Sequence, residues 1–241
     1  MNGFVLSSTM RTGLLLFALS TLASAEVQEK TSKFSGTTLR YKVVLPNGFD
    51  AAKEYPVVLA FPGGAQTTQM VDGVIERNWR SEAEKRGYIV VVPEAPNGDL
   101  FFEGGERVFP EFLKKLLADY KVRGGKFFMA GVSNGGISAF HVAASHPSYF
   151  WSITGLPGYL PTANETRVNA ISKMCIYMFV GEQDSGWRED MQAQSEVFRK
   201  RGMTVKFAVE KGQGHIMATL SGAGAARLFD QFEQSKAGCG K

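Results

Sequence analysis

Apolar residues recur along this chain with two different spacings. Continuous apolar runs are typical of strands covered on both faces, and stretches with apolar residues three or four apart are typical of helices. Strands are predicted at 37–45, 56–61, 88–92, 150–156, 174–180 and 204–209, and helices at 71–86, 107–120, 137–144, 188–201 and 216–234. Because strands and helices alternate, we expect an α/β fold with a mostly parallel sheet and helices on both faces.

The domain organisation follows from the extent of this pattern. No internal repeat or linker interrupts it, so residues 26–241 are predicted to form a single domain. By composition, we expect weak order before about residue 35 and after about residue 235. The interval 159–172 is too short for a large helical lid, which predicts an open cleft if the chain binds a ligand.

The first 25 residues have the composition of a signal peptide. Arg11 is the only charge before Glu26, an apolar core spans 13–22, and Ala-Ser-Ala at 23–25 matches a cleavage site. A retained anchor and a buried first helix are the alternatives, but the apolar core is short for a bilayer span. We therefore expect a secreted or periplasmic protein without stable membrane insertion.

Charge and cysteine content narrow the function classes further. The net charge is +4 with no basic run, which disfavours nucleic acid as a partner. Cys175 lies in an apolar run and Cys239 in a glycine-rich tail. Export would permit a disulfide, but a single pair of cysteines is too little evidence to predict one. No spacing indicates a metal site, and no cofactor is predicted.

One motif stands out from the pattern. An apolar run that starts after Lys126 is predicted as a further strand; it ends at Gly131-Val132-Ser133-Asn134-Gly135, and the next predicted helix follows at once. Strand, G-x-S-x-G and helix together are typical of a nucleophile elbow, in which a strained serine projects from the sheet edge. The residues two positions before and after the serine must be small, and here both are glycine.

A nucleophilic serine needs a base, and the base needs a group that fixes its tautomer. Of three histidines, His141 lies inside a predicted helix and His146 ends it, so both are expected to be structural. His215 follows a strand in a glycine-rich loop, at the edge where open α/β sheets bind ligands. Asp184 follows the preceding strand and is preferred as the orienting carboxylate, with Glu182 as the alternative.

Acyl transfer also requires donors for the developing oxyanion. The backbone N–H of Asn134, directly after the serine, is one candidate. The second is expected in the small-residue loop after the strand at 56–61, with Gly64 preferred and Ala65 as the alternative.

These motifs together resemble the α/β-hydrolases. The resemblance covers about 39–232 and rests on the elbow, on Phe-Pro-Gly-Gly-Ala-Gln at 61–66, on Gly-Glu-Gln-Asp at 181–184 and on Gly214-His215. The chain is most similar to exported esterases grouped with polyhydroxybutyrate depolymerases and feruloyl or acetylxylan esterases. The resemblance implies Ser133 as nucleophile, His215 as base, Asp184 as its orienter, and Gly64 and Asn134 as oxyanion donors. Relatives usually carry a histidine where this chain has Pro62, so its loop is expected to hold its shape differently.

The expected activity is a serine carboxylesterase acting on feruloyl or acetyl esters of a polysaccharide, or on a polyester. Phe101 and Trp187 are predicted to line the substrate rim, with Phe102 as a further candidate and Trp151 expected in the core. A serine peptidase of the same fold and a binding module without activity are the alternatives. The substrate rests on the resemblance alone, because one fold hosts many functions.

Overall fold

The computed structural model describes residue 1 and residues 26–239, so the predicted signal peptide lies almost wholly outside the described residues. The described residues build an eight-stranded sheet in the order β1-β2-β4-β3-β5-β6-β7-β8. Strand β2 runs antiparallel to β1 and β4, whereas the pairs from β4 through β8 are parallel. The strands are β1 (Val27–Phe34), β2 (Thr37–Val44), β3 (Val57–Phe61), β4 (Ile89–Pro93), β5 (Phe127–Gly131), β6 (Phe150–Gly155), β7 (Cys175–Gly181) and β8 (Val205–Glu210).

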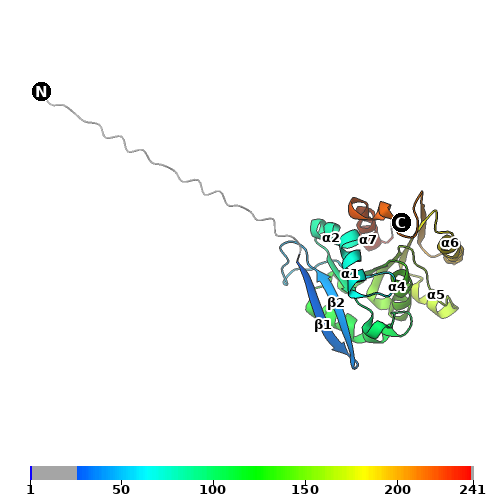
Figure 1. The fold of residues 1–241 in the computed structure, drawn as a ribbon, viewed down its shortest axis with the longest axis horizontal. Helices are drawn as coiled ribbons and strands as arrows, with labels where there is room; N and C mark the ends of the chain where they lie inside the picture. Colours follow the sequence, from blue (N-terminus) through cyan, green and yellow to red (C-terminus); the bar gives the residue numbers. More distant parts are fainter. Residues whose placement is uncertain (2–25, 240–241) are drawn as a thin grey trace.

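Helices cover both faces of this sheet (Figure 1). Successive strand residues point to opposite faces, so in β3 Val57 and Leu59 enter one core while Val58 and Ala60 enter the other. Helices α3, α4, α5 and α6 pack on the first core, and α1, α2 and α7 on the second. The helices are α1 (Thr68–Val74), α2 (Arg80–Arg86), α3 (Phe109–Asp119), α4 (Asn134–Ser145), α5 (Glu165–Ile171), α6 (Ser185–Lys200) and α7 (Ala226–Lys236). The predicted doubly covered α/β architecture is confirmed.

The predicted weak order near the N-terminus is wrong for residues 27–34. These residues form β1 and pair with β2 along its whole length. The strand is mostly polar and only partly buried, so its stability comes from the ladder with β2 and not from an apolar face. A pattern search based on hydrophobicity therefore gives no signal for it.

Two helices differ from their predicted extents. The stretch predicted as one helix at 71–86 begins at Thr68 and contains a π-helical turn, Ile75–Trp79, between α1 and α2. The stretch predicted from 216 becomes α-helical only at Ala226, after two short 3-10 turns. Helix α5, which was not predicted, buries Val168 and Ile171 in the core and is no lid.

The C-terminal end is more ordered than its composition suggests. Helix α7 continues to Lys236, and a disulfide joins Cys175 in β7 to Cys239. The two cysteines are 64 residues apart in sequence. Closing a loop of that length lowers the entropy of the unfolded chain and contributes roughly 4 kcal/mol in the chain-entropy account.

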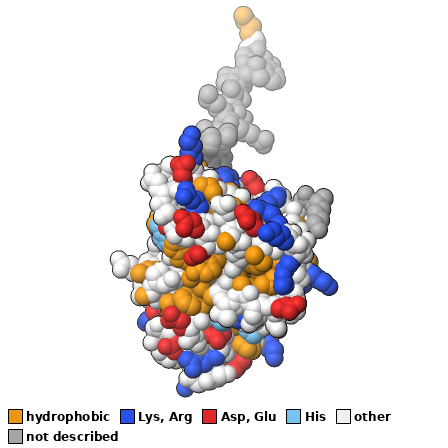
Figure 2. All heavy atoms as spheres, turned by 90° about the vertical axis from the view of Figure 1, so that its right-hand side faces the viewer, with side chains coloured by type: hydrophobic (Ala, Val, Ile, Leu, Met, Phe, Trp, Pro, Cys, Tyr) orange, Lys and Arg blue, Asp and Glu red, His pale blue; other side chains and the backbone are white. Residues whose placement is uncertain are grey.

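The last strand, β8, forms one edge of the sheet, and of its residues only Glu210 is buried. Seen from the side of α6, the surface shows a band of apolar side chains between charged ones (Figure 2). Within the part of the chain that the structure describes, every helix falls short of the length and apolarity needed to cross a bilayer.

Candidate active site

Ser133 occupies a sharp turn between β5 and α4. Its backbone has φ 58° and ψ −122°, a region that side-chain-bearing residues rarely adopt. A Cβ on Gly131 would lie 2.0 Å from the carbonyl oxygen of Gly135, and one on Gly135 would lie 2.3 Å from that of Phe61. Only glycine fits at these two positions, and their close backbone contacts hold the strained serine in place.

Three loops that are far apart in the sequence bring together the hydroxyl of Ser133, the imidazole of His215 and the carboxylate of Asp184. The His215 Nε2 lies 2.8 Å from Ser133 Oγ, and its Nδ1 lies 2.7 Å from Asp184 Oδ2. The side chain of Asp184 is 15% exposed and that of His215 is 39% exposed. The carboxylate is therefore sheltered while the imidazole faces the solvent side, where a substrate would arrive.

The alternative carboxylate, Glu182, serves another purpose. Its Oε2 accepts a 2.8 Å hydrogen bond from the backbone N–H of Gly212, and its backbone carbonyl accepts one from Arg188. Glu182 thus ties the loop after β7 to the loop that carries His215. Asp184, and not Glu182, contacts the imidazole.

The His215 loop is anchored at its start by Glu210, the last residue of β8. Both carboxylate oxygens of Glu210 accept from Arg227, at 2.8 and 2.9 Å, and Oε2 also accepts from Thr219. The hydrogen bonds from Arg227, the largest cause, lower the pKa of Glu210 despite its burial. These bonds join the strand end to the segment after His215 and limit the loop's movement.

The loop after β3 lies against the elbow on its other side. Gly63 and Gly64 line the space in front of Ser133, while Ala65 does not. The side chain of Asn134 donates a 3.1 Å bond to the Gly64 carbonyl. Asn134 is also the first residue of α4, so its own N–H has no acceptor within the helix. Both predicted oxyanion donors therefore border the serine.

Gln66 belongs to the loop motif noted in the sequence but was assigned no role there, although its side chain fixes this loop. It is fully buried, and its Nε2 donates a 2.9 Å bond to Ser138 Oγ in α4. Its backbone carbonyl accepts from Ala95, beyond the end of β4. Gln66 thus holds the loop in place. This agrees with the expectation that a loop carrying Pro62 keeps its shape through different contacts. Pro62, which departs from the pattern of the proteins that the sequence resembles, was the available signal.

An open cleft of about 470 Å³ lies in front of Ser133. Its walls come from the β3 loop, α1, the π-helical turn, the elbow and the His215 loop. They comprise Gly63, Gly64, Gln69, Met70, Gly73, Arg77, Val132, Ser133, His215 and Ile216. Sequence reasoning missed the contribution of Gln69 and Met70, which precede the helix predicted at 71–86, and of Arg77, because that helix was interpreted only as an element covering the core.

The predicted rim residues have different positions. Trp187 lies beside the site, with its ring 5.4 Å from that of His215 and 5.3 Å from that of Tyr159. The assignment of Phe101 to the rim is wrong, since its side chain is 0% exposed and packs edge-on against Phe61. A loop phenylalanine gives no periodicity from which its direction could be predicted. Trp151 packs under Lys126, at 4.8 Å, and against the core.

In the part of the chain that the structure describes, the hydrogen bonds and ring contacts of His215 involve neither Phe102 nor the two other histidines. Phe102 is half-buried. His141 lies within α4, 3.8 Å from Glu106, and His146 ends that helix. Burial lowers the pKa of both imidazoles, and Arg167 lowers that of His141 further. Neither belongs to the triad of contacts around Ser133.

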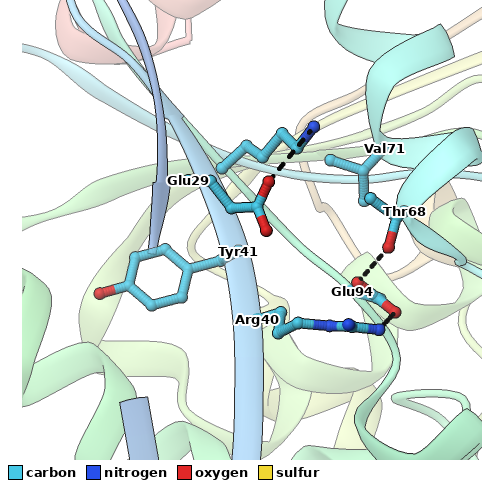
Figure 3. A pocket seen from close by; sticks show the side chains of 7 residues that line it. Glu29, Arg40, Tyr41, Thr68, Val71 and Glu94 are labelled. Carbon is cyan, nitrogen blue, oxygen red and sulfur yellow. Dashed lines mark hydrogen bonds and ion pairs between the residues drawn. The ribbon is translucent and has the colours of Figure 1, made fainter. Parts of the chain in front are cut away.

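A polar cluster behind the cleft wall holds α1 against the sheet (Figure 3). Glu94, just after β4, accepts from Arg40 at 2.6 Å and from Thr68, the first residue of α1, at 2.7 Å. The space among these side chains is about 10 Å³, which leaves room for no more than about one water. The cluster therefore positions the cleft wall and does not form a ligand pocket.

Comparison with known proteins adds to this geometry. No family model matches the chain. Dipeptidyl-peptidase 5 of Porphyromonas gingivalis is 29% identical over 161 residues, which cover 62% of this chain and 23% of that peptidase. The match thus spans about a quarter of that relative's length.

Solved structures resemble this chain over most of its length. A ferulic acid esterase from Anaeromyces mucronatus superimposes with a TM-score of 0.67 at 15% identity, covering 89% of this chain and 92% of the esterase. An S-formylglutathione hydrolase from Agrobacterium tumefaciens gives a TM-score of 0.63 at 16% identity, covering 88% and 94%. With the strand order and the helices on both faces, these likenesses identify the fold of this chain as that of the α/β-hydrolases.

Proposed function

We propose that the chain is a serine carboxylesterase that works through an acyl-enzyme. The observation that carries the proposal is the line of contacts from Ser133 Oγ to His215 and from His215 to Asp184. A hydroxyl becomes a useful nucleophile at neutral pH only when a positioned base takes its proton. Esterases among the structural neighbours support the same reaction class.

In the proposed reaction, Ser133 Oγ attacks the ester carbonyl carbon while its proton passes to His215 Nε2. The N–H groups of Gly64 and Asn134 stabilise the oxyanion of the tetrahedral intermediate. Collapse of this intermediate breaks the bond to the alcohol, which leaves with the proton from His215. Water then repeats the sequence on the acyl-enzyme and releases the acid. Asp184 accepts the Nδ1–H bond and stabilises the imidazolium.

The proposed substrate is an ester with a bulky or polymeric component, such as a feruloyl or acetyl ester on a polysaccharide, or a polyester. An open cleft, with no lid over it among the described residues, suits such a molecule. The ring of Trp187, beside His215, offers an apolar surface for an acyl or aromatic group.

A serine peptidase is the second candidate, favoured by the similarity to a dipeptidyl-peptidase. The same triad chemistry cleaves amides, so activity on ester and amide substrates has to be compared to distinguish an esterase from a peptidase. A binding module without activity would have no need for three reactive groups in contact, and the geometry weighs against it.

Labelling with a fluorophosphonate probe tests the nucleophile. We expect covalent modification at Ser133 in the folded protein and none in Ser133→Ala, with mass spectrometry of peptides identifying the residue. Turnover of p-nitrophenyl acetate, methyl ferulate and aminoacyl anilides then divides esterase from peptidase. Absence of labelling in correctly folded protein would refute the proposal.

We also propose that residues 1–25 direct export and are removed before Glu26. The disulfide between Cys175 and Cys239 supports this, because such bonds persist mainly in oxidising compartments. N-terminal sequencing of the exported protein should begin at Glu26. A mature chain that retains residues 1–25 would contradict it.

A further inference from the structure

Arg77 is a charged residue in the wall of the cleft, and the proposed esterase reaction gives it no role. It lies in the π-helical turn Ile75–Trp79 and lines the same space as Ser133 and His215. The other cleft residues include no carboxylate. Turns of this kind occur frequently at functional sites, because the inserted residue redirects side chains from the regular helical face.

The guanidinium is held in place from one side. Arg77 Nε donates a 3.1 Å bond to Oδ1 of Asn78, and the buried Asn78 in turn donates a 2.9 Å bond to the carbonyl of Leu220. This chain of bonds uses Nε and leaves the terminal Nη groups as the donors available to a ligand. Arg77 is half-buried, so the fold already restricts the conformations of its side chain. A ligand that binds it therefore loses less free energy to the ordering of that side chain.

Nearby carboxylates are engaged with other cations. Asp72 pairs with Lys42 at 2.5 Å, and Glu76 pairs with Arg80 at 2.8 Å. Within the described part of the chain, Arg77 forms no ion pair of its own. An arginine that lines a substrate cleft, is partly buried and has no ion-pair partner among the described residues is a matched partner for a planar anion.

We infer that Arg77 selects esters that carry a carboxylate near the scissile bond and binds that carboxylate through its Nη groups. The inference rests on the proposed function and adds a substrate class to it. Two sources supply the same chemistry: an acid group on the acyl side, as in a monoester of a dicarboxylic acid, or one on the alcohol side, as in an esterified hydroxy acid.

Two matched substrate pairs distinguish these sources. The acyl pair is p-nitrophenyl hemisuccinate and its methyl ester, and the alcohol pair is 4-acetoxybenzoate and 4-acetoxybenzamide. In each pair, the ratio of kcat/KM for the charged substrate to that for the neutral one is measured on a single enzyme sample. Partial misfolding of a variant therefore cancels from the ratio.

We expect Arg77→Gln to lower this ratio by about tenfold to hundredfold in at least one pair, as loss of a charge-assisted bond implies. Arg77→Lys should give a ratio between those of the wild type and Arg77→Gln, because lysine keeps the positive charge but lacks the planar guanidinium that can form two parallel hydrogen bonds. Arg201→Gln is the matched control: this exposed arginine at the end of α6 bonds Asn169 and should leave both ratios unchanged.

Two results overturn the inference and are distinguishable. If neutral esters turn over and Arg77→Gln leaves both ratios unchanged, Arg77 does not bind a substrate carboxylate, although the proposed esterase function is retained. If no ester turns over and Ser133 is not labelled by the fluorophosphonate probe, the proposed function falls and the inference falls with it.

Discussion

The elbow and the His215 loop reach the same cleft and both contain close backbone contacts at a glycine, but charged side chains also hold the His215 loop. The elbow depends on backbone packed against backbone, with glycines where a Cβ would lie 2.0–2.3 Å from a carbonyl oxygen. The His215 loop has a similar contact, since a Cβ on Gly181 would lie 2.1 Å from the carbonyl oxygen of Gly214, and it is held in addition by hydrogen bonds that the carboxylates of Glu210 and Glu182 accept. The serine should therefore be sensitive to the size of its neighbours, and the histidine to their size, to their charge and to pH.

The largest expected effect separates the two carboxylates of the β7 loop. Asp184→Asn should lower kcat by about 10⁴-fold with the fold intact, because the amide favours the wrong imidazole tautomer. Glu182→Gln should lower it far less, since Glu182 accepts from the Gly212 N–H and does not touch His215. Steady-state kinetics on p-nitrophenyl acetate measures both. A near-normal rate in Asp184→Asn would contradict the assignment.

The second prediction tests the size limit at the elbow. Gly131→Ala should lower the free energy of unfolding by about 4 kcal/mol or more, because its Cβ would overlap the Gly135 carbonyl. Gly186→Ala, in α6, is the matched control: its Cβ would meet nothing within 4 Å. The control should be neutral or stabilise by up to about 1 kcal/mol. Urea unfolding measures both, and equal effects would refute the packing argument.

The smallest of the three effects tests the charge dependence of the His215 loop. Glu210→Gln should cost about 2–3 kcal/mol in unfolding free energy, because it removes a charged acceptor of Arg227 and Thr219. The exposed Glu54→Gln should change stability little.

The pH dependence of that cost sharpens the test. Arg227 lowers the pKa of Glu210 in the folded state. The stability that the Glu210 carboxylate contributes is therefore fully present above the pKa of the unfolded state, 4.5, and is lost as the pH falls through the pKa of the folded state. The difference between the wild type and Glu210→Gln should therefore shrink below about pH 4.5. A difference that is constant with pH would show that the glutamate acts through packing alone.

The local motifs made much of the site predictable. An elbow requires glycines at fixed positions around a serine between a strand and a helix, and this requirement is visible in sequence. The carboxyl ends of parallel strands meet at one edge, so the order of Ser133, Asp184 and His215 suggested their convergence. Choosing between Asp184 and Glu182 required coordinates, because two carboxylates in one loop differ only in direction.

Other features left no local pattern. Strand β1 gains its stability from pairing with β2, and Phe101 turns inward because the aromatic side chains of Phe61 and Phe109 surround it. Arg77 follows the ordinary polar spacing of an amphipathic helix. Only the π-helical turn and the packing of α1 against the sheet place it beside Ser133.

By itself the sequence determined the alternation of strands and helices, the glycine-flanked turn and the residue types available for acyl transfer, because these depend on local periodicity and sterics. Tertiary structure decided which carboxylate meets the imidazole, which aromatic residues reach the cleft, and that Cys175 pairs with Cys239. Such outcomes depend on the direction of side chains brought together from segments far apart in the chain, and no local pattern encodes that direction.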